Sequence, residues 1–325
     1  MRSNRSLTTP LTASDFPVDP EGRVYHLQLH PEDLAPDIII VGDPGRAAAI
    51  AERYLASREC ERSHRGLVTI TGRTAGGLRV TVTTSGMGTP SLEIVLQELV
   101  ALNELDFATR TRKTEFPRLH IIRVGTSGGL QAATPLGAPI VTTYAIGLDN
   151  TGLFYDVPTK DPHIPRLERE LHDLITAAQP ESRLRGAIRP YVARCSPEIV
   201  AAMRAAGSDL GAPVITGLTV SNSGFFSNQG RDVTRLLPSV PDIDRLVADF
   251  DPQLGGERVE NMEMETSFLA HFMTGLGYMA GAICPAISNR RLDTFSPTYP
   301  EAMDRAIVIA LEALRLLRGQ TSERS

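Results

Sequence analysis

Short apolar runs that end in glycine, alternating with segments of helical spacing, constrain the fold of this chain most strongly. The run Asp37–Val41 is followed by Gly42, and the run 119–124 leads into a glycine-rich turn. Runs of this length, bounded by turn residues, are typical of buried strands. Strands that alternate with helices predict an α/β fold. We expect a single domain of three layers, in which helices flank a central mixed β-sheet.

Helix start signals and apolar spacing place the other elements. Asp43 has the character of an N-cap, and Pro44 and Pro90 suit a first helical turn. Expected helices cover 44–55, 89–102, 266–276 and 300–319, and also most of 163–207, where breaks are expected near 180 and 190. Expected strands cover 37–41, 68–70, 80–84, 119–124, 140–148, 214–221 and 278–288. Polar composition indicates a loop at 109–118 and a loop with short helices at 233–259. We expect residues 1–20 to be a flexible extension and 21–320 to be the folded domain.

The composition excludes several classes of protein. A net charge of -5 provides no basic field for nucleic acid. Cys60, Cys195 and Cys284 are too few and too widely spaced for a disulfide framework or a zinc site, which suits a reducing, cytoplasmic setting. The most apolar stretch, 272–287, contains glycines and is shorter than the roughly 20 residues of a spanning helix. We therefore expect neither a membrane nor a nucleic-acid partner.

Two strand ends combine glycine with arginine in a way that suits an anion. In Gly42–Arg46, glycine lets a backbone N–H approach an anion, and a helix N-terminus follows. In Arg123–Gly129, hydroxyls and N–H groups of a tight turn follow an arginine near the end of a buried strand. Each segment also has a plainer interpretation, as a junction with a surface arginine or as a turn with a structural ion pair. The charge of Asp43 counts against anion binding unless its side chain points away.

Two further segments suit a sugar and a flat heterocycle. Glu260–Glu265 brings three carboxylates together, which either bind paired ribose hydroxyls or form an acidic first helical turn. In Gly224–Arg231, Gln229 and Arg231 can bind the imide edge of a base while Phe225 packs on its face. The alternative for this segment is a surface loop that its phenylalanines anchor to the core.

Taken in order, these segments resemble motifs of the nucleoside phosphorylase-I superfamily and, within it, of the uridine phosphorylase branch. The matching stretches are Gly-Asp-Pro-Gly-Arg at 42–46, Ser-Gly-Met-Gly-Thr-Pro-Ser at 85–91, Ile-Ile-Arg-Val-Gly-Thr-Ser-Gly-Gly at 121–129 and Asn-Met-Glu-Met-Glu-Thr at 261–266. The resemblance runs from about Val24 to Leu317 and implies a phosphorylase/hydrolase-like fold. Four ordered matches are far more specific than any one of them.

The resemblance implies a role for each matched residue. It assigns phosphate to Gly42, Arg46, Arg65, Arg123, Gly125 and Thr126; ribose to His26, Glu263, Met264 and Glu265; and the base to Phe225, Gln229, Arg231 and Arg290. The expected catalytic residues are Arg123, Gln229, Arg231 and Glu265. Arg65 and His26 would complete the site of a neighbouring subunit, which predicts a homo-oligomer, either a dimer or a trimer of dimers. Outside the family context, His26 and Arg65 would pass as surface residues.

The leaving group discriminates between purine and pyrimidine substrates. A purine departs well once its imidazole nitrogen is protonated, and the purine-cleaving hexameric relatives carry an Asp for this purpose after the Ser of this strand. Here Asn289 follows Ser288. A uracil anion instead needs donors at its carbonyls and imide, which Gln229, Arg231 and Arg290 supply. The resemblance therefore implies cleavage of uridine or a related pyrimidine nucleoside by phosphate, as in nucleoside catabolism and pyrimidine salvage.

Several alternatives stay open. They are a purine nucleoside phosphorylase, a nucleosidase, which needs no phosphate-binding arginines, and a non-catalytic nucleoside-binding protein, which would lack Glu265 or those arginines. Gly66 stands where uridine enzymes often carry an acidic residue associated with a potassium ion, so we expect no metal. No organic cofactor is implied, and phosphate is the co-substrate. The segment 109–118 has the character of an insertion, and the poorly matched loop 232–258 leaves uridine, thymidine and modified pyrimidines as substrates.

Overall fold

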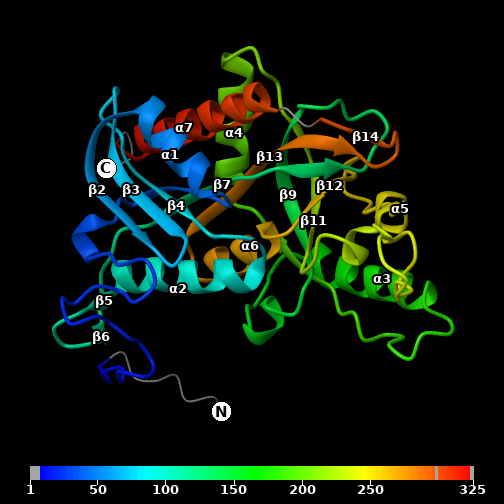
Figure 1. Ribbon diagram of the computed structural model, residues 1–325, viewed down its shortest axis with the longest axis horizontal. Coiled ribbons are helices and arrows are strands. Elements are labelled where there is room, and N and C mark those ends of the chain that lie inside the picture. The colour runs from blue at the N-terminus through cyan, green and yellow to red at the C-terminus, as the bar shows by residue number, and fades with distance from the viewer. Residues whose placement is uncertain (1–7, 297–298, 323–325) are drawn as a thin grey trace. The chain divides into compact units, whose positions relative to one another are not determined.

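The computed structural model describes residues 8–296 and 299–322, whose contacts form two compact units. The first unit holds the described residues up to Gly86 together with Glu93–His120; the second holds Met87–Leu92 and the described residues from Ile121 onward. Figure 1 colours the first unit from blue to cyan and most of the second from green to red. Each unit combines strands and helices, so the predicted α/β class is confirmed. The boundary of a single folded domain at 21–320 stays a prediction.

A mixed sheet organises the first unit. Its order is β1 (Asp37–Val41), β4 (Arg79–Thr84), β3 (Leu67–Thr74) and β2 (Leu55–His64). β1 and β4 are parallel, whereas β3 is antiparallel to both of its neighbours. α1 (Pro44–Tyr54) begins where the cap predicts it, and α2 (Thr89–Glu104) begins at the expected Thr-Pro pair. A short 3-10 helix, η1 (Pro31–Asp33), precedes β1.

The N-terminal segment lies against a short hairpin made of β5 (Leu105–Asp106) and β6 (Thr111–Arg112). The guanidinium of Arg110 donates to the carbonyls of Leu11 and Thr12 at 2.8 Å each, and to that of Phe16. These hydrogen bonds, which are part-buried or exposed, hold residues 11–16 against the hairpin, and the flexible extension expected over 1–20 stays a prediction. Residues 1–7 lie outside the described residues.

The second unit is built on another mixed run of strands. Their order is β10 (Tyr191–Arg194), β9 (Pro139–Leu148), β11 (Ile215–Asn222), β12 (Val259–Glu263), β8 (Ser127–Gly129), β13 (Met279–Asn289) and β7 (His120–Val124), and β14 (Thr294–Phe295) pairs with β13. β9, β11 and β12 are parallel, and β10 is antiparallel to β9. β9 also pairs with β13, so the strands from β9 to β13 close into a ring.

Helices cover these strands. α3 (His163–Ala177) contacts β10 and α5 (Ile243–Ala248). α4 (Pro197–Asp209) contacts α7 (Pro300–Ser322), as Figure 1 shows. α6 (Thr266–Gly275) contacts β10, β11 and β13. Two short 3-10 helices, η2 (Gly152–Phe154) and η3 (Ser227–Gln229), follow β9 and β11. The predicted mixed sheet with flanking helices is thus confirmed, and the ends of β9, β11 and β12 carry the loops that build the site.

Several strands lie outside the predicted set, among them β2, β8, β10 and β12. β2 is mostly exposed and polar, β8 consists of Ser-Gly-Gly, and β10 falls inside the stretch that was expected to be helical. Their extended conformation depends on pairing with strands far away in the sequence, and such pairing overrides local propensity. This is why local patterning misses them.

Two glycines make room for the ring of Tyr191. A Cβ on Gly147 would lie 2.3 Å from that ring, and one on Gly152 would lie 2.4 Å from it. The ring cannot move aside easily, because its hydroxyl donates to Asp149 at 2.8 Å and lies 3.0 Å from the hydroxyl of Ser267. The close approach of β9 and of η2 to the ring of Tyr191 therefore requires glycine at both positions.

We expect Gly147→Ala to lower the free energy of unfolding by about 1–3 kcal/mol, because overpacking forces strands or side chains apart. Urea denaturation followed by circular dichroism measures this change. Gly76→Ala is the matched control, since the nearest atom to its Cβ would be Thr74 Oγ1 at 3.9 Å. Equal midpoints for the two variants would show that β10 shifts without cost.

Candidate functional site

One guanidinium and two carboxylates form a buried cluster in the second unit. Arg123 lies in β7, Glu263 ends β12 and Glu265 directly precedes α6. Nη1 of Arg123 lies 3.0 Å from Oε2 of Glu263, and its Nη2 donates to Oε2 of Glu265. None of the three side chains is more than 5% exposed. The carboxylates explain how a charged arginine is stable in the core, because an unpaired buried charge is costly.

Glu263 is held rigidly by the start of α6. Its carboxylate accepts the backbone N–H groups of Glu265 and Thr266 at distances between 3.0 and 3.2 Å, and the hydroxyl of Ser221. It thereby satisfies N–H groups that a helix N-terminus leaves without partners. The alternative of an acidic first helical turn is wrong, because 259–263 is a strand. Glu260 instead accepts the hydroxyl of Thr134 at 2.9 Å, away from the cluster.

Glu265 combines its ion pair with a backbone contact. Its Oε1 accepts the N–H of Gly88 at 2.5 Å, and a Cβ on Gly88 would lie 4.0 Å from Cε of Met264. Burial raises the pKa of the Glu265 carboxyl, and the charge of Glu263 adds to this, while Arg123 opposes it. Two of the predicted ribose residues, Met264 and Glu265, thus lie beside Gly88 of the motif 85–91.

Burial lowers the pKa of Arg123, but the two carboxylates raise it by more, so the net pKa lies above the ordinary value. Both pKa values are raised, which favours the charged form of Arg123 and disfavours that of Glu265, because one cation serves two anions. The cluster therefore carries one net negative charge when all three groups are ionised. A phosphate dianion beside it needs further cations.

Gly125 has a different role from the one expected. Its N–H donates to the carbonyl of Ile283 at 3.2 Å, so this N–H is occupied within the sheet. A Cβ at this position would lie 1.9 Å from Nη1 of Arg123. Gly125 therefore makes room for the guanidinium, which corrects its assignment as a phosphate donor. Thr126 follows it as a half-buried residue.

Cys284 is a contact of the cluster that no sequence motif marks. Nη1 of Arg123 lies 3.1 Å from its sulfur. Burial raises the pKa of the Cys284 thiol to about 12, so the sulfur accepts this hydrogen bond as a neutral group. An apolar strand position carries no local signal for such a contact, which depends on the packing of β13 against β7.

The predicted base-binding residues of the loop after β11 do lie together. Nη1 of Arg231 donates to Oε1 of Gln229 at 2.7 Å and to the carbonyl of Phe225 at 2.6 Å. Gln229 is buried, and its Nε2 lies 3.5 Å from the carbonyl of Glu263, which links this loop to the cluster. The Arg231 guanidinium lies 3.9 Å from the centroid of the Phe225 ring. One face of Phe225 is therefore covered by Arg231, and a base would pack on the other face or displace the guanidinium.

Arg290 anchors this loop. Its Nε lies 3.1 Å from Oδ2 of Asp244, and its Nη2 donates to the carbonyl of Gly230 at 3.1 Å. Gly230 has φ of +71°, and a Cβ there would lie 2.1 Å from Asp244. Burial lowers the pKa of Arg231, and the charge of Arg290 contributes to this. The N–H donors of Arg290, which were expected to meet a base carbonyl, are used here to position the loop.

Asn289 is a fully bonded core residue. Its Nδ2 donates to the carbonyls of Gln131 and Thr134 at 2.9 and 2.8 Å, and its Oδ1 accepts the amides of Arg291 and Leu292. Each hydrogen bond suits an amide, and the two carbonyls would repel a carboxylate. The structure therefore supplies a local reason for Asn at this position.

In the first unit, the carboxylate of Asp43 accepts the amides of Gly45 and Arg46 at 3.2 and 3.0 Å. The cap therefore uses these two first-turn amides, and the assignment of Gly42 and Arg46 to phosphate stays a prediction. Gly42 and the Arg46 side chain are half-buried, and a Cβ on Gly42 would lie 3.3 Å from the carbonyl of Gly86.

His26 and Arg65 also belong to the first unit. Nδ1 of His26 lies 2.7 Å from Oε1 of Glu98, whose carboxylate also accepts the amides of His26 and Leu27. Glu98 is thus a positioning residue that the sequence did not reveal. Arg65 and Gly66, with φ of +51° and +80°, form the tip of the β2–β3 hairpin. Arg65 is exposed there, as a residue that reaches another subunit must be.

The described residues contain neither a candidate metal site nor a candidate membrane span. No group of three or more His, Cys, Asp or Glu side chains there could hold a metal ion. No helix in the same part of the chain is long and apolar enough to cross a membrane.

Comparison with known proteins identifies related chains. The model of the family described as the Phosphorylase superfamily matches residues 36–315. A uridine phosphorylase of Thermococcus kodakarensis is 27% identical over 312 residues, which cover 96% of this chain and 93% of the relative. A DeoD-type purine nucleoside phosphorylase of Jannaschia sp. is 34% identical over 134 residues, which cover only 41% of this chain and 51% of the relative.

A solved structure extends this similarity to the fold. The crystal structure of a Trypanosoma brucei nucleoside phosphorylase, described as showing uridine phosphorylase activity, has a TM-score of 0.83 to this chain. The two are 32% identical, and the match covers 93% of this chain and 99% of the other. The similarity to uridine phosphorylases therefore spans nearly the whole chain, whereas the Jannaschia purine enzyme matches less than half of it.

Proposed function

Because the chain belongs to the phosphorylase superfamily, we propose that it is a uridine phosphorylase, which converts uridine and inorganic phosphate to uracil and ribose 1-phosphate. The observation that carries this proposal is the contact between the Gln229–Arg231 pair and the Arg123–Glu265 cluster. It brings donors for an imide edge next to a carboxylate for ribose hydroxyls and a guanidinium for phosphate. The base, the ribose and the phosphate are the three parts of the substrates that must meet.

The proposed mechanism uses position and charge. A phosphate oxygen attacks the anomeric carbon while the glycosidic bond breaks, and its electron pair leaves with uracil. Glu265 holds the ribose hydroxyls, and Arg123 orients the phosphate. Gln229 and Arg231 donate to the uracil carbonyls as negative charge develops there, and the base then takes up a proton. Preorganised donors of this kind lower the barrier without a metal or organic cofactor.

Phosphate binding needs more positive charge than Arg123 provides. Its guanidinium is already shared by Glu263 and Glu265, so a phosphate dianion would meet a net negative cluster. We extend the proposed phosphate site to Gly42, Thr126 and the side chains of Arg46 and Arg65. Arginines bind phosphate through paired N–H donors, which suits this role.

We also propose that Arg65 and His26 act in the site of a neighbouring subunit within a closed homo-oligomer. Coexpression of the variants Arg65→Ala and Arg123→Ala tests this. Each variant alone is expected to be nearly inactive, whereas random mixing in a dimer should restore about a quarter of the wild-type activity, because mixed dimers regain one intact site. No recovery, despite mixed dimers detected by mass spectrometry, would show that each subunit uses its own Arg65.

Substituting Asn289→Asp is expected not to create activity on inosine. The carboxylate would face the carbonyls of Gln131 and Thr134 and would lose both hydrogen bonds, at a cost of about 1–3 kcal/mol in the free energy of unfolding. Thermal melting and an inosine assay measure the two effects. Inosine cleavage by a stable variant would show that this single position selects the base.

The function itself is tested by following cleavage of uridine, thymidine and inosine by ultraviolet absorbance, with and without phosphate. We expect phosphate-dependent loss of uridine and no loss of inosine. Phosphate-dependent cleavage of inosine alone would make the chain a purine enzyme. Cleavage without phosphate would make it a nucleosidase. That outcome would contradict the role in cytoplasmic pyrimidine salvage that we propose for the chain.

A further inference from the structure

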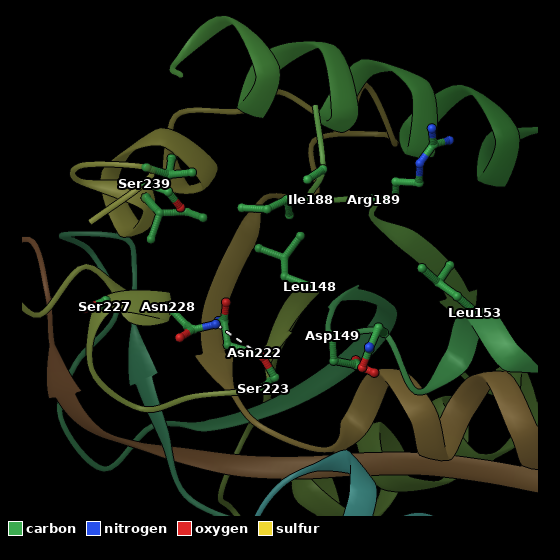
Figure 2. A pocket seen from close by; sticks show the side chains of 14 residues that line it. Leu148, Asp149, Leu153, Ile188, Arg189, Asn222, Ser223, Ser227, Asn228 and Ser239 are labelled. Atoms are coloured by element: carbon green, nitrogen blue, oxygen red, sulfur yellow. Dashed lines mark hydrogen bonds between the residues drawn. The ribbon is translucent and has the colours of Figure 1, made fainter. Parts of the chain in front are cut away.

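A cavity lies in the second unit, beside the loop that carries Gln229 and Arg231. It encloses about 370 Å³ and opens at the ends of β9 and β11, where Leu148 and Asn222 end their strands (Figure 2). Ser227 and Asn228 line this cavity, whereas Gln229 bonds to Arg231 and lies near the carbonyl of Glu263. The loop therefore has one side toward the proposed active site and another toward this cavity. The volume falls in the range typical of sites for small molecules.

Asn222 is the unusual residue of the cavity wall. It is 1% exposed, yet neither Nδ2 nor Oδ1 has a hydrogen-bond partner among the described residues. Other buried asparagines of this unit are bonded: the amide of Asn261 accepts from Thr219 and donates to Ser127, and that of Asn289 is bonded on both sides. A buried amide without partners costs about 1–3 kcal/mol per unmet group. In a cavity wall, such an amide can bind a ligand that carries the complementary donor and acceptor.

The chemistry of the wall narrows the class of ligand. An amide offers one donor and one acceptor side by side, and its complement is a lactam edge with adjacent N–H and C=O groups. Leu148, Ile188 and Val240 contribute apolar surface that suits the faces of a flat ring. Figure 2 shows Leu148 and Ile188 above Asn222, and Asn228 and Ser223 beside it.

The charged residues of the wall do not call for a charged ligand. The carboxylate of Asp149 is already used, because it accepts the hydroxyls of Tyr191 and Ser267 and the amide of Thr151. Arg189 is exposed, and Figure 2 shows its side chain directed away from Asn222. A neutral ring is therefore the best match.

We propose that this cavity is a second binding site for a free pyrimidine base, which pairs its lactam edge with the amide of Asn222 and packs between Leu148 and Ile188. The site is separate from the residues that bind the substrate base. The cavity and its unpaired amide select a flat ring with a lactam edge, and the choice of a pyrimidine base rests on the proposed function.

Crystals soaked in 5-bromouracil locate the base directly, through the anomalous scattering of bromine. We expect one peak in the cavity next to Asn222 and a second beside Gln229 and Arg231. Asn222→Leu has a similar volume and is expected to abolish the first peak and to keep the second. Ile188→Trp, which narrows the cavity from the other wall, should do the same, so the test does not depend on one variant.

Equilibrium dialysis with labelled uracil gives the stoichiometry in solution. We expect two molecules per chain for the wild type and one for Asn222→Leu, with at least tenfold weaker binding at the lost site. 1,3-Dimethyluracil has the same ring without an N–H donor, so it should fail to displace labelled uracil from the cavity. A single peak beside Gln229 and one uracil per chain would overturn this inference alone, whereas a single peak in the cavity would support it and count against the proposed function.

Discussion

Replacing Arg123 with alanine is expected to lower kcat/KM for uridine by about 10²–10³-fold or more, because one preorganised donor for the developing charge is lost. The same change leaves Glu263 and Glu265 buried without their cation. Breaking a buried ion pair from one side costs about 3–5 kcal/mol of unfolding free energy. Steady-state kinetics and urea denaturation measure the two effects separately.

Two controls distinguish catalysis from stability in this prediction. Arg194→Ala removes an exposed arginine paired with Asp161 and should change neither quantity strongly. A triple variant, Arg123→Met with Glu263→Gln and Glu265→Gln, removes all three charges and should recover much of the stability but none of the activity. If Arg123→Ala keeps wild-type kcat/KM while stability falls, the cluster is structural and phosphate binds elsewhere.

The acid limb of the pH profile is the second large effect. Burial and the charge of Glu263 raise the pKa of Glu265, and only its ionised form can accept ribose hydroxyls. As the pH falls through this raised pKa, Glu265 takes up a proton and kcat/KM should fall about tenfold per pH unit. The decline should begin at a higher pH than for an ordinary glutamate.

Glu263→Gln removes a negative neighbour, so the pKa of Glu265 should fall and the acid limb should move to lower pH. Glu260→Gln is the matched control, because Glu260 lies on the same strand and its carboxylate bonds to Thr134 instead. It should leave the limb where it is. An acid limb that is the same in all three proteins would show that another group controls the profile.

The order of chemically informative residues was predictable from the sequence. Asp43 and Pro44 begin α1, and the apolar run 37–41 forms β1, because caps and strand patterning act over a few residues. The motifs around Arg123 and Glu265 could also be matched, and the family they indicated is confirmed by the model match over 36–315. The assignment of single residues to phosphate, ribose and base stays a prediction.

What only the tertiary structure decided is which of these groups meet. Arg123 and Glu265 are 142 positions apart and form an ion pair, while Gly125 makes room for the guanidinium instead of binding an anion. Asn222 has no local feature that marks it, and its unpaired amide becomes visible only beside the cavity that β9 and β11 form. The reason is physical: caps and helical spacing depend on neighbours in the chain, whereas burial and pairing depend on the register of distant strands.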